Sequence, residues 1–279
     1  MNTLLQRSIT AVFFVAVMLL GIYAHQYSML LLFGVVCVGG IWEYQTLVQN
    51  FNFHKHPKPQ NDHYWQALLG TTIYFVLSMV LLQWLAVWYL AILLPLPYLL
   101  LVKELFDAAS PNPFARAAIH LLGWIYVAIP LALLNYLAID TNGLFAPNRI
   151  VGILLLIWAN DAVAYLAGSK IGSSPLFKRV SPKKTWEGTI SGIIGTMIVA
   201  SALCFVMPQS FTVMQWYGIA ILVACFSTIG DLIESVLKRN VGVKDSGNLL
   251  PGHGGILDRF DALLFVIPFI WVFVFLTTK

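Results

Sequence analysis

Long apolar runs separated by short polar stretches make up most of this chain. A helix that crosses a bilayer needs about 20 mainly apolar residues. Nine segments approach that length, namely 9–24, 28–44, 66–83, 85–102, 117–137, 149–168, 189–207, 213–233 and 261–277. The runs are continuous and lack the alternation of a membrane β-barrel. We therefore expect an all-α fold, a polytopic integral membrane protein with about nine transmembrane helices.

The composition agrees with this fold class. Charged residues are 10% of the chain and apolar residues 59%, whereas soluble domains carry about 25% charged residues. So little charge cannot cover the surface of a soluble protein, so lipid must be the solvent for much of the chain. The net charge is only +4, without a basic stripe on a soluble domain, which argues against nucleic acid as a partner.

The positions of the basic residues predict an orientation. Lys and Arg near the ends of spans stay in the cytoplasm. With nine spans and a cytoplasmic N-terminus, fourteen of the 16 Lys and Arg residues lie on the cytoplasmic side. Only Arg149 and Lys279 fall outside. We therefore place the protein in the inner (cytoplasmic) membrane of the cell, as a multi-pass protein.

A polar face runs along the end of the eighth span. If the helix continues past residue 233, then Asp231, Glu234, Ser235 and Lys238 share one face. Such a face on an apolar helix must contact protein or a water-filled cavity. The alternative is a helix end whose cations reach into the headgroups. This explains Lys238 and Arg239 but not Asp231.

Glycines and carboxylates gather just before the last span. Segment 251–255, "PGHGG", is a turn whose backbone can approach a ligand closely. Asp258 and Asp261 follow, one helical turn apart and beside Arg259; they could be simple helix caps. If Asp231 joins them, three carboxylates repel one another unless a hard cation binds. Mg²⁺ prefers such oxygen ligands.

Two polar residues, Asn160 and Asp161, interrupt the span over 149–168. An ionisable residue at membrane depth indicates function. The alternative is a structural aspartate that hydrogen bonds to Tyr165 or Lys170.

The polar segment over 174–189 is rich in basic residues. It could simply bind anionic lipid headgroups. Its mixture of hydroxyls, ammonium groups and glycine also suits a polyphosphate. Together with the carboxylates, it favours phosphoryl or nucleotidyl transfer between a lipid and a soluble anion, where charge neutralisation does most of the catalysis.

The stretch from Ser235 to Asp261, "SVLKRNVGVKDSGNLLPGHGGILDRFD", resembles the signature of phosphatidate cytidylyltransferases, also called CDP-diacylglycerol synthases. The family pattern contains Ser-x-apolar-Lys-Arg, then Lys-Asp, then Pro-x-His-Gly-Gly, and finally Asp-Arg-apolar-Asp, and every element is present. The upstream "NDAVAY" and "SPKKTWEG" also look like the family's sequences. The first 150 residues resemble it only as a series of apolar spans.

The resemblance implies the reaction of CTP with phosphatidic acid to give CDP-diacylglycerol and pyrophosphate, a step of phospholipid biosynthesis. It also implies Mg²⁺, with room for a second, monovalent cation such as K⁺, and a homodimer embedded in membrane lipid. The family's metal-binding aspartates map onto Asp231, Asp258 and Asp261.

The remaining assignments combine the resemblance with the chemistry of the side chains. The predicted catalytic residues are Lys238, Arg239, Lys244, His253, Asp258 and Arg259. The predicted substrate-binding residues are Asn160, Asp161, Ser181, Lys183, Lys184, Thr185, Glu187, Ser235, Gly254 and Gly255. The chain is expected to divide into N-terminal membrane helices over 1–145 and a catalytic membrane domain over 146–279, with its active site on the cytoplasmic side.

Three other functions are compatible with parts of the pattern. A CTP-dependent polyprenol or lipid kinase would release CDP instead of pyrophosphate. A cation-coupled transporter could use Asp161 and Asp231, although transporters often carry broken helices in two related halves, and here the polar residues crowd into the second half. A non-catalytic lipid-binding scaffold gives no reason for clustered carboxylates.

Overall fold

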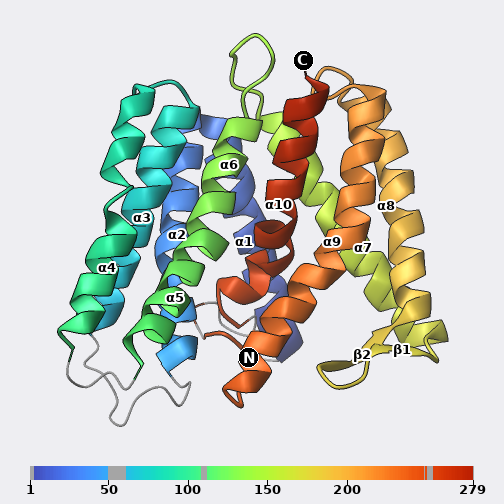
Figure 1. Ribbon diagram of the computed structural model, residues 1–279. Helices are drawn as coiled ribbons and strands as arrows, with labels where there is room; N and C mark the ends of the chain where they lie inside the picture. Colours follow the sequence, from blue (N-terminus) through green and yellow to red (C-terminus); the bar gives the residue numbers. More distant parts are fainter. Residues whose placement is uncertain (1–2, 50–60, 108–111, 248, 250–253, 279) are drawn as a thin grey trace. The chain divides into compact units, whose positions relative to one another are not determined.

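The computed structural model describes residues 3–49, 61–107, 112–247, 249 and 254–278, and these are almost entirely helical (Figure 1). The α-helices are α1 (Thr3–Ala24), α2 (Gln26–Gln49), α3 (Asn61–Leu81), α4 (Leu96–Leu105), α5 (Pro113–Gly123), α6 (Ile129–Leu137), α7 (Pro147–Ile171), α8 (Trp186–Val206), α9 (Val213–Asn240) and α10 (Leu257–Thr277). Two short irregular helices, η1 (Val87–Ile92) and η2 (Trp124–Ala128), and two strands, β1 (Pro175–Phe177) and β2 (Ser181–Thr185), complete the elements.

The predicted membrane spans all coincide with helical segments. In the part of the chain that the structure describes, eight segments are long and apolar enough to cross a membrane, and Ser8–Ala24 of α1 is a shorter apolar helix. The all-α, polytopic membrane class is therefore confirmed.

Two of these spans are less regular than the sequence predicts. The expected helix over 85–102 is the 3₁₀ helix η1 followed by α4, with Pro95 at the N-cap of α4. The span over 117–137 contains the π-helical turn η2. Pro130 follows it, and because proline lacks an N–H, the carbonyl four residues earlier has no α-helical donor.

The segment between α7 and α8, treated as a loop in the sequence, forms a small antiparallel hairpin of β1 and β2. Pro175 pairs with Thr185 and Phe177 with Ser181, with an irregularity between them. The Trp186 N–H donates to the Ser174 carbonyl at 2.9 Å. The hairpin is thereby tied to the first residue of α8.

The chain divides into two compact units. The first comprises Met1–Tyr136 and Asn240–Asp258, and the second comprises Leu137–Arg239 and Arg259–Lys279. The division predicted at residue 145 stays a prediction.

In the first unit, a buried polar chain joins three helices. The Tyr74 hydroxyl of α3 donates to the Leu30 carbonyl of α2 at 2.7 Å, and Asn135 Nδ2 of α6 donates to the Tyr74 hydroxyl at 2.8 Å. Interhelical hydrogen bonds of this kind hold membrane helices together because lipid offers no alternative partner.

In the second unit, glycines of α8 bring it close to α7. A Cβ on Gly192 would lie 2.9 Å from Asn160 Oδ1, and one on Gly195 would lie 2.7 Å from a Val163 methyl carbon. Small residues at such positions allow close packing where lipid gives no hydrophobic drive. Between α9 and α10, Phe226 and Phe269 stack with ring centroids 4.0 Å apart.

Candidate active site

The backbones of α9 and α10 approach closely at Gly230. A Cβ there would lie 2.9 Å from the Asp261 carbonyl oxygen and 3.2 Å from Ala262 Cα. Only glycine fits this contact. The contact places Asp231, the next residue of α9, beside Asp261 of α10.

Three carboxylates meet at this contact. Asp231, Glu234 and Asp261 each present one oxygen, and these three oxygens lie within 4.8 Å of one another. Glu234 is buried, and the two aspartates are half-buried. We call Asp231, Glu234 and Asp261 the carboxylate cluster. Three converging hard oxygen donors suit a hard divalent cation, so these residues fit Mg²⁺.

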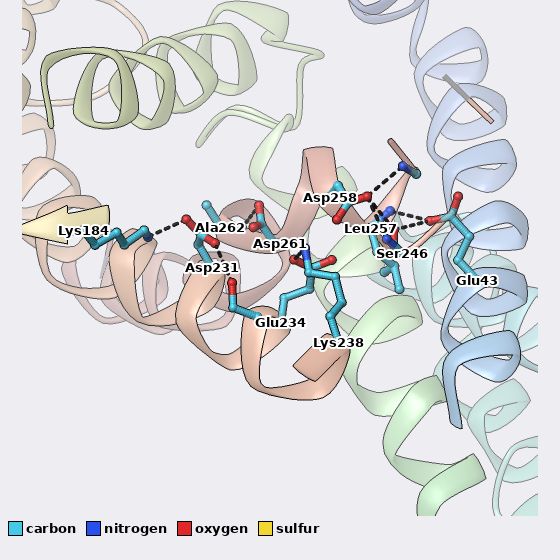
Figure 2. A network of polar contacts seen from close by, with 12 residues as sticks. Glu43, Lys184, Asp231, Glu234, Lys238, Ser246, Leu257, Asp258, Asp261 and Ala262 are labelled. Carbon is cyan, nitrogen blue, oxygen red and sulfur yellow. Dashed lines mark hydrogen bonds and ion pairs between the residues drawn. The ribbon is translucent and has the colours of Figure 1, made fainter. Parts of the chain in front are cut away.

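Two lysines offset part of the charge of the carboxylate cluster. Lys184 of β2 forms an ion pair with Asp231, and Lys238 pairs with Glu234 at 2.5 Å, one turn along α9 (Figure 2). The Ser235 hydroxyl donates to Asp231 Oδ1 at 3.4 Å. The polar face predicted from the sequence thus forms, and it makes contacts with protein groups.

Asp161 is held between α7 and α9. Its Oδ1 accepts hydrogen bonds from Ser227 Oγ at 3.2 Å and from Asn160 Nδ2 at 3.4 Å. Tyr165 and Lys170, the partners considered from the sequence, are not among those that the structure describes for it. The substrate-binding roles of Asn160 and Asp161 stay predictions.

The hairpin and the start of α8 place the predicted CTP-binding residues. Thr185 caps α8, because its hydroxyl accepts from the Gly188 N–H at 3.2 Å. Glu187 accepts hydrogen bonds from the backbone N–H groups of Ser173 and Ser174, so it fixes the entry to the hairpin. Ser181 is half-buried and Lys183 is exposed. Of these residues, only Lys184 is described in contact with the carboxylate cluster.

Asp258, in the first unit, has a different environment from the carboxylate cluster. Its Oδ2 accepts from the Ser246 N–H at 2.9 Å, the Ser246 hydroxyl at 3.0 Å and the Gly255 N–H at 2.8 Å. Gly254 has a positive φ of 83°, and a Cβ there would lie 2.6 Å from the same oxygen. Asp258 therefore organises the turn before α10. A metal-binding role would use its other oxygen and stays a prediction.

The other predicted catalytic residues have few described contacts. Arg239, Lys244 and Arg259 are exposed. His253 lies outside the described residues.

Two residues of these polar networks had no predicted role: Ser246, and Glu43 of α2, whose carboxylate accepts a hydrogen bond from the Ser246 hydroxyl. A third, Glu234, had no predicted metal-binding role. Glu234 lies on the predicted polar face, one turn after Asp231, so its place in the carboxylate cluster was within reach of the helical periodicity. Glu43 lies in the apolar span over 28–44. An ionisable side chain within an apolar span is the same feature that singled out Asp161. Ser246 carries no such signal.

The fold and the site define a class of protein, a multi-pass helical membrane protein with a cluster of three carboxylates paired with two lysines. The profile of the Cytidylyltransferase family matches residues 5–277. The chain belongs to this family, and the resemblance drawn from residues 235–261 is confirmed. The match also extends through the first 150 residues, whose only resemblance to the family in the sequence alone is a series of apolar spans.

Individual proteins similar to this chain are consistent with membership of the family. The chain is 38% identical to the phosphatidate cytidylyltransferase of Bacillus subtilis (strain 168) over 65% of this chain and 64% of that protein. It is also 38% identical to that of Staphylococcus aureus (strain COL) over 62% of each. The match thus spans less than two thirds of these two relatives. The phosphatidate cytidylyltransferase of Haemophilus influenzae (strain ATCC 51907 / DSM 11121 / KW20 / Rd) is 29% identical over 97% of this chain and 98% of that protein.

Proposed function

We propose that the protein is a phosphatidate cytidylyltransferase, which converts CTP and phosphatidic acid into CDP-diacylglycerol and pyrophosphate. The observation that carries this proposal is the carboxylate cluster with its two paired lysines, in a chain of the Cytidylyltransferase family. The names of the relatives support the choice of CTP and phosphatidate as substrates.

The reaction requires little acid–base chemistry. A phosphate oxygen of phosphatidate attacks the α-phosphorus of CTP, the new P–O bond forms, and the bond to the β-phosphate oxygen breaks to release pyrophosphate. The nucleophile is already ionised at neutral pH, because the second pKa of a phosphate monoester is about 6. The main obstacle is repulsion, about 4 kcal/mol for each pair of unit charges 4 Å apart at an effective dielectric constant of about 20.

The residues of the chain can offset this repulsion. Asp231, Glu234 and Asp261 would hold a Mg²⁺ ion, with Asp258 as a further ligand from the family signature. Bound there, the ion supplies positive charge at the reacting phosphates. Lys184 reaches the carboxylate cluster from β2, and so we assign Ser181, Lys183, Lys184, Thr185 and Glu187 to CTP.

The remaining cations and turn residues are assigned to the two phosphate groups. We assign phosphatidate or the leaving pyrophosphate to the signature residues Ser235, Lys238, Arg239, Lys244, His253, Gly254, Gly255 and Arg259. Asn160 and Asp161 complete the substrate site from α7.

Location and assembly are inferred from the sequence. We propose that the protein lies in the inner (cytoplasmic) membrane. The fourteen-to-two asymmetry of Lys and Arg favours an orientation with the active site on the cytoplasmic side. We further propose a homodimer and a second, monovalent cation such as K⁺, as the family resemblance implies.

A product assay tests the proposal. Purified protein in detergent is incubated with CTP, phosphatidate and Mg²⁺, and the lipid and soluble products are identified. We expect CDP-diacylglycerol and pyrophosphate, lost on addition of EDTA and in Asp261→Asn. Asp140→Asn, the same chemical change outside the carboxylate cluster, should retain turnover. Release of CDP would instead indicate a lipid kinase, and cation flux without CTP turnover would indicate a transporter.

A further inference from the structure

Glu43 is a buried carboxylate in α2, in the half of the chain that carries none of the signature residues. Its side chain is 3% exposed. It accepts hydrogen bonds from the Leu257 N–H at 2.9 Å and the Ser246 hydroxyl at 2.9 Å (Figure 2). It also accepts one from the Ile256 N–H at 2.8 Å. All three donors lie in the signature segment, here residues 246–257.

These hydrogen bonds provide acceptors for backbone N–H groups at the start of α10. The first N–H groups of a helix have no partner within it, and α10 begins at Leu257. A carboxylate at that end satisfies these N–H groups and is favoured by the helix dipole. Glu43 therefore fixes the point at which α10 begins.

The contact continues through Ser246 to Asp258. The Ser246 hydroxyl lies 2.9 Å from Glu43 Oε2 and 3.0 Å from Asp258 Oδ2. A hydroxyl has a single proton to donate, so the two carboxylates share it. The orientation of Asp258 is thus coupled to Glu43 through one side chain.

Glycines make room for this arrangement. A Cβ on Gly39, one turn before Glu43 in α2, would collide with the Ile256 side chain. A Cβ on Gly247 would lie 2.8 Å from the Glu43 carboxyl carbon, and one on Gly255 would lie 2.6 Å from it. Glycines in α2 and in the signature segment therefore leave the space that the Glu43 carboxylate and its contacts occupy.

We propose that Glu43 is a positioning residue for the cytidylyl transfer, a role that rests on the function proposed above. It holds the signature segment through two backbone N–H groups and, through Ser246, orients Asp258, without touching substrate. In Glu43→Gln the side chain keeps its shape, but one acceptor oxygen becomes an NH₂ group facing a donor. At least one of the three hydrogen bonds is then lost.

The kinetic test compares Glu43→Gln, Ser246→Ala and the double variant. We expect each single variant to lower kcat about 10–100-fold, the usual effect of losing a group that orients a site, with the KM for CTP changed less than about twofold. The double variant should be no slower than the worse single variant, because the two residues act as a unit. Gln45→Ala is the matched control, because Gln45 is buried in the same helix but contacts His120.

Hydrogen exchange provides a readout that does not depend on turnover. Peptides covering residues 254–262 should exchange faster in Glu43→Gln than in the wild type, and at the wild-type rate in Gln45→Ala. A wild type that makes no CDP-diacylglycerol would refute the proposed function. The hydrogen-exchange data would still show whether Glu43 holds the signature segment. A kcat per folded molecule within about twofold of wild type in Glu43→Gln, or multiplying losses in the double variant, would overturn the positioning role.

Discussion

Removing a charge from the carboxylate cluster should stabilise the protein when no divalent cation is present. In Asp261→Asn, repulsion from Asp231 and Glu234 disappears. One oxygen of each of the three carboxylates lies within 4.8 Å of the others, and two unit charges at that upper limit repel by about 3.5 kcal/mol at an effective dielectric constant of about 20. The substitution keeps the acceptor oxygen for the Ala262 N–H, now 2.8 Å from Asp261 Oδ1.

The net gain in folding free energy should be smaller than the sum of the two repulsions, those of Asp261 with Asp231 and with Glu234. Asp231 is half-buried and screened by solvent, and Lys184 and Lys238 already offset part of the negative charge. We therefore expect a net stabilisation of about 1–2 kcal/mol. At about 2–4 °C per kcal/mol, the Tm in EDTA should rise by a few degrees.

In the presence of Mg²⁺, the wild type should have a higher Tm than Asp261→Asn, the reverse of the order expected in EDTA. The wild type gains about 2.7 kcal/mol from a ligand present at 100 times its Kd, whereas Asp261→Asn has lost a ligand and should gain little. Thermal unfolding in detergent, followed with and without Mg²⁺, measures both effects. Asp140→Asn is the control, because Asp140 lies in the loop between α6 and α7 and its variant should respond to Mg²⁺ as the wild type does. A lower Tm for Asp261→Asn in EDTA, or an undiminished Mg²⁺ response, would refute the reasoning.

Three further predictions concern other parts of the chain. Lys183→Ala should raise the KM for CTP about tenfold with kcat retained in steady-state assays, because the role proposed for this exposed ammonium group is binding of CTP only. Gly188→Ala should lower the Tm, because its Cβ would lie 2.7 Å from the Ala164 carbonyl oxygen. The backbone N–H of Leu144 lowers the pKa of Asp140. Ionised Asp140 therefore stabilises the folded protein above its unfolded pKa of about 3.9, and this contribution is lost as the pH falls through the folded pKa. In Asp140→Asn, the Tm should therefore fall less steeply as the pH is lowered through this range.

Much of the fold could be predicted because its causes are local. A bilayer requires long apolar helices, and their lengths are visible in the sequence. The same holds for the polar face of α9, since helical periodicity places Asp231 and Glu234 together. The broken helix after α3 and the hairpin before α8 were missed because proline positions and tertiary contacts decide them.

The contacts of Glu43 could not be predicted in the same way. More than 200 residues separate it from Ser246 and Leu257 along the chain. No periodicity within one helix connects positions so far apart. The one signal in the sequence that could have singled out Glu43 is the cost of an ionisable side chain in an apolar span. That cost shows that the residue needs partners but does not identify them.

The carboxylates of the predicted site fall into two kinds once their partners are known. Glu43 and Asp258 each accept three hydrogen bonds from backbone N–H groups and the Ser246 hydroxyl. Through those hydrogen bonds, the two carboxylates hold the backbone of the signature segment in place. Asp231 and Asp261 instead lie close to each other and to Glu234, and a bound cation would relieve the repulsion between these carboxylates. Sequence spacing and the family resemblance grouped Asp258 with these two aspartates, whereas the hydrogen bonds that its Oδ2 accepts give it a structural role in the turn before α10. The stabilisation by Mg²⁺ should therefore depend far more on Asp231 and Asp261 than on Glu43.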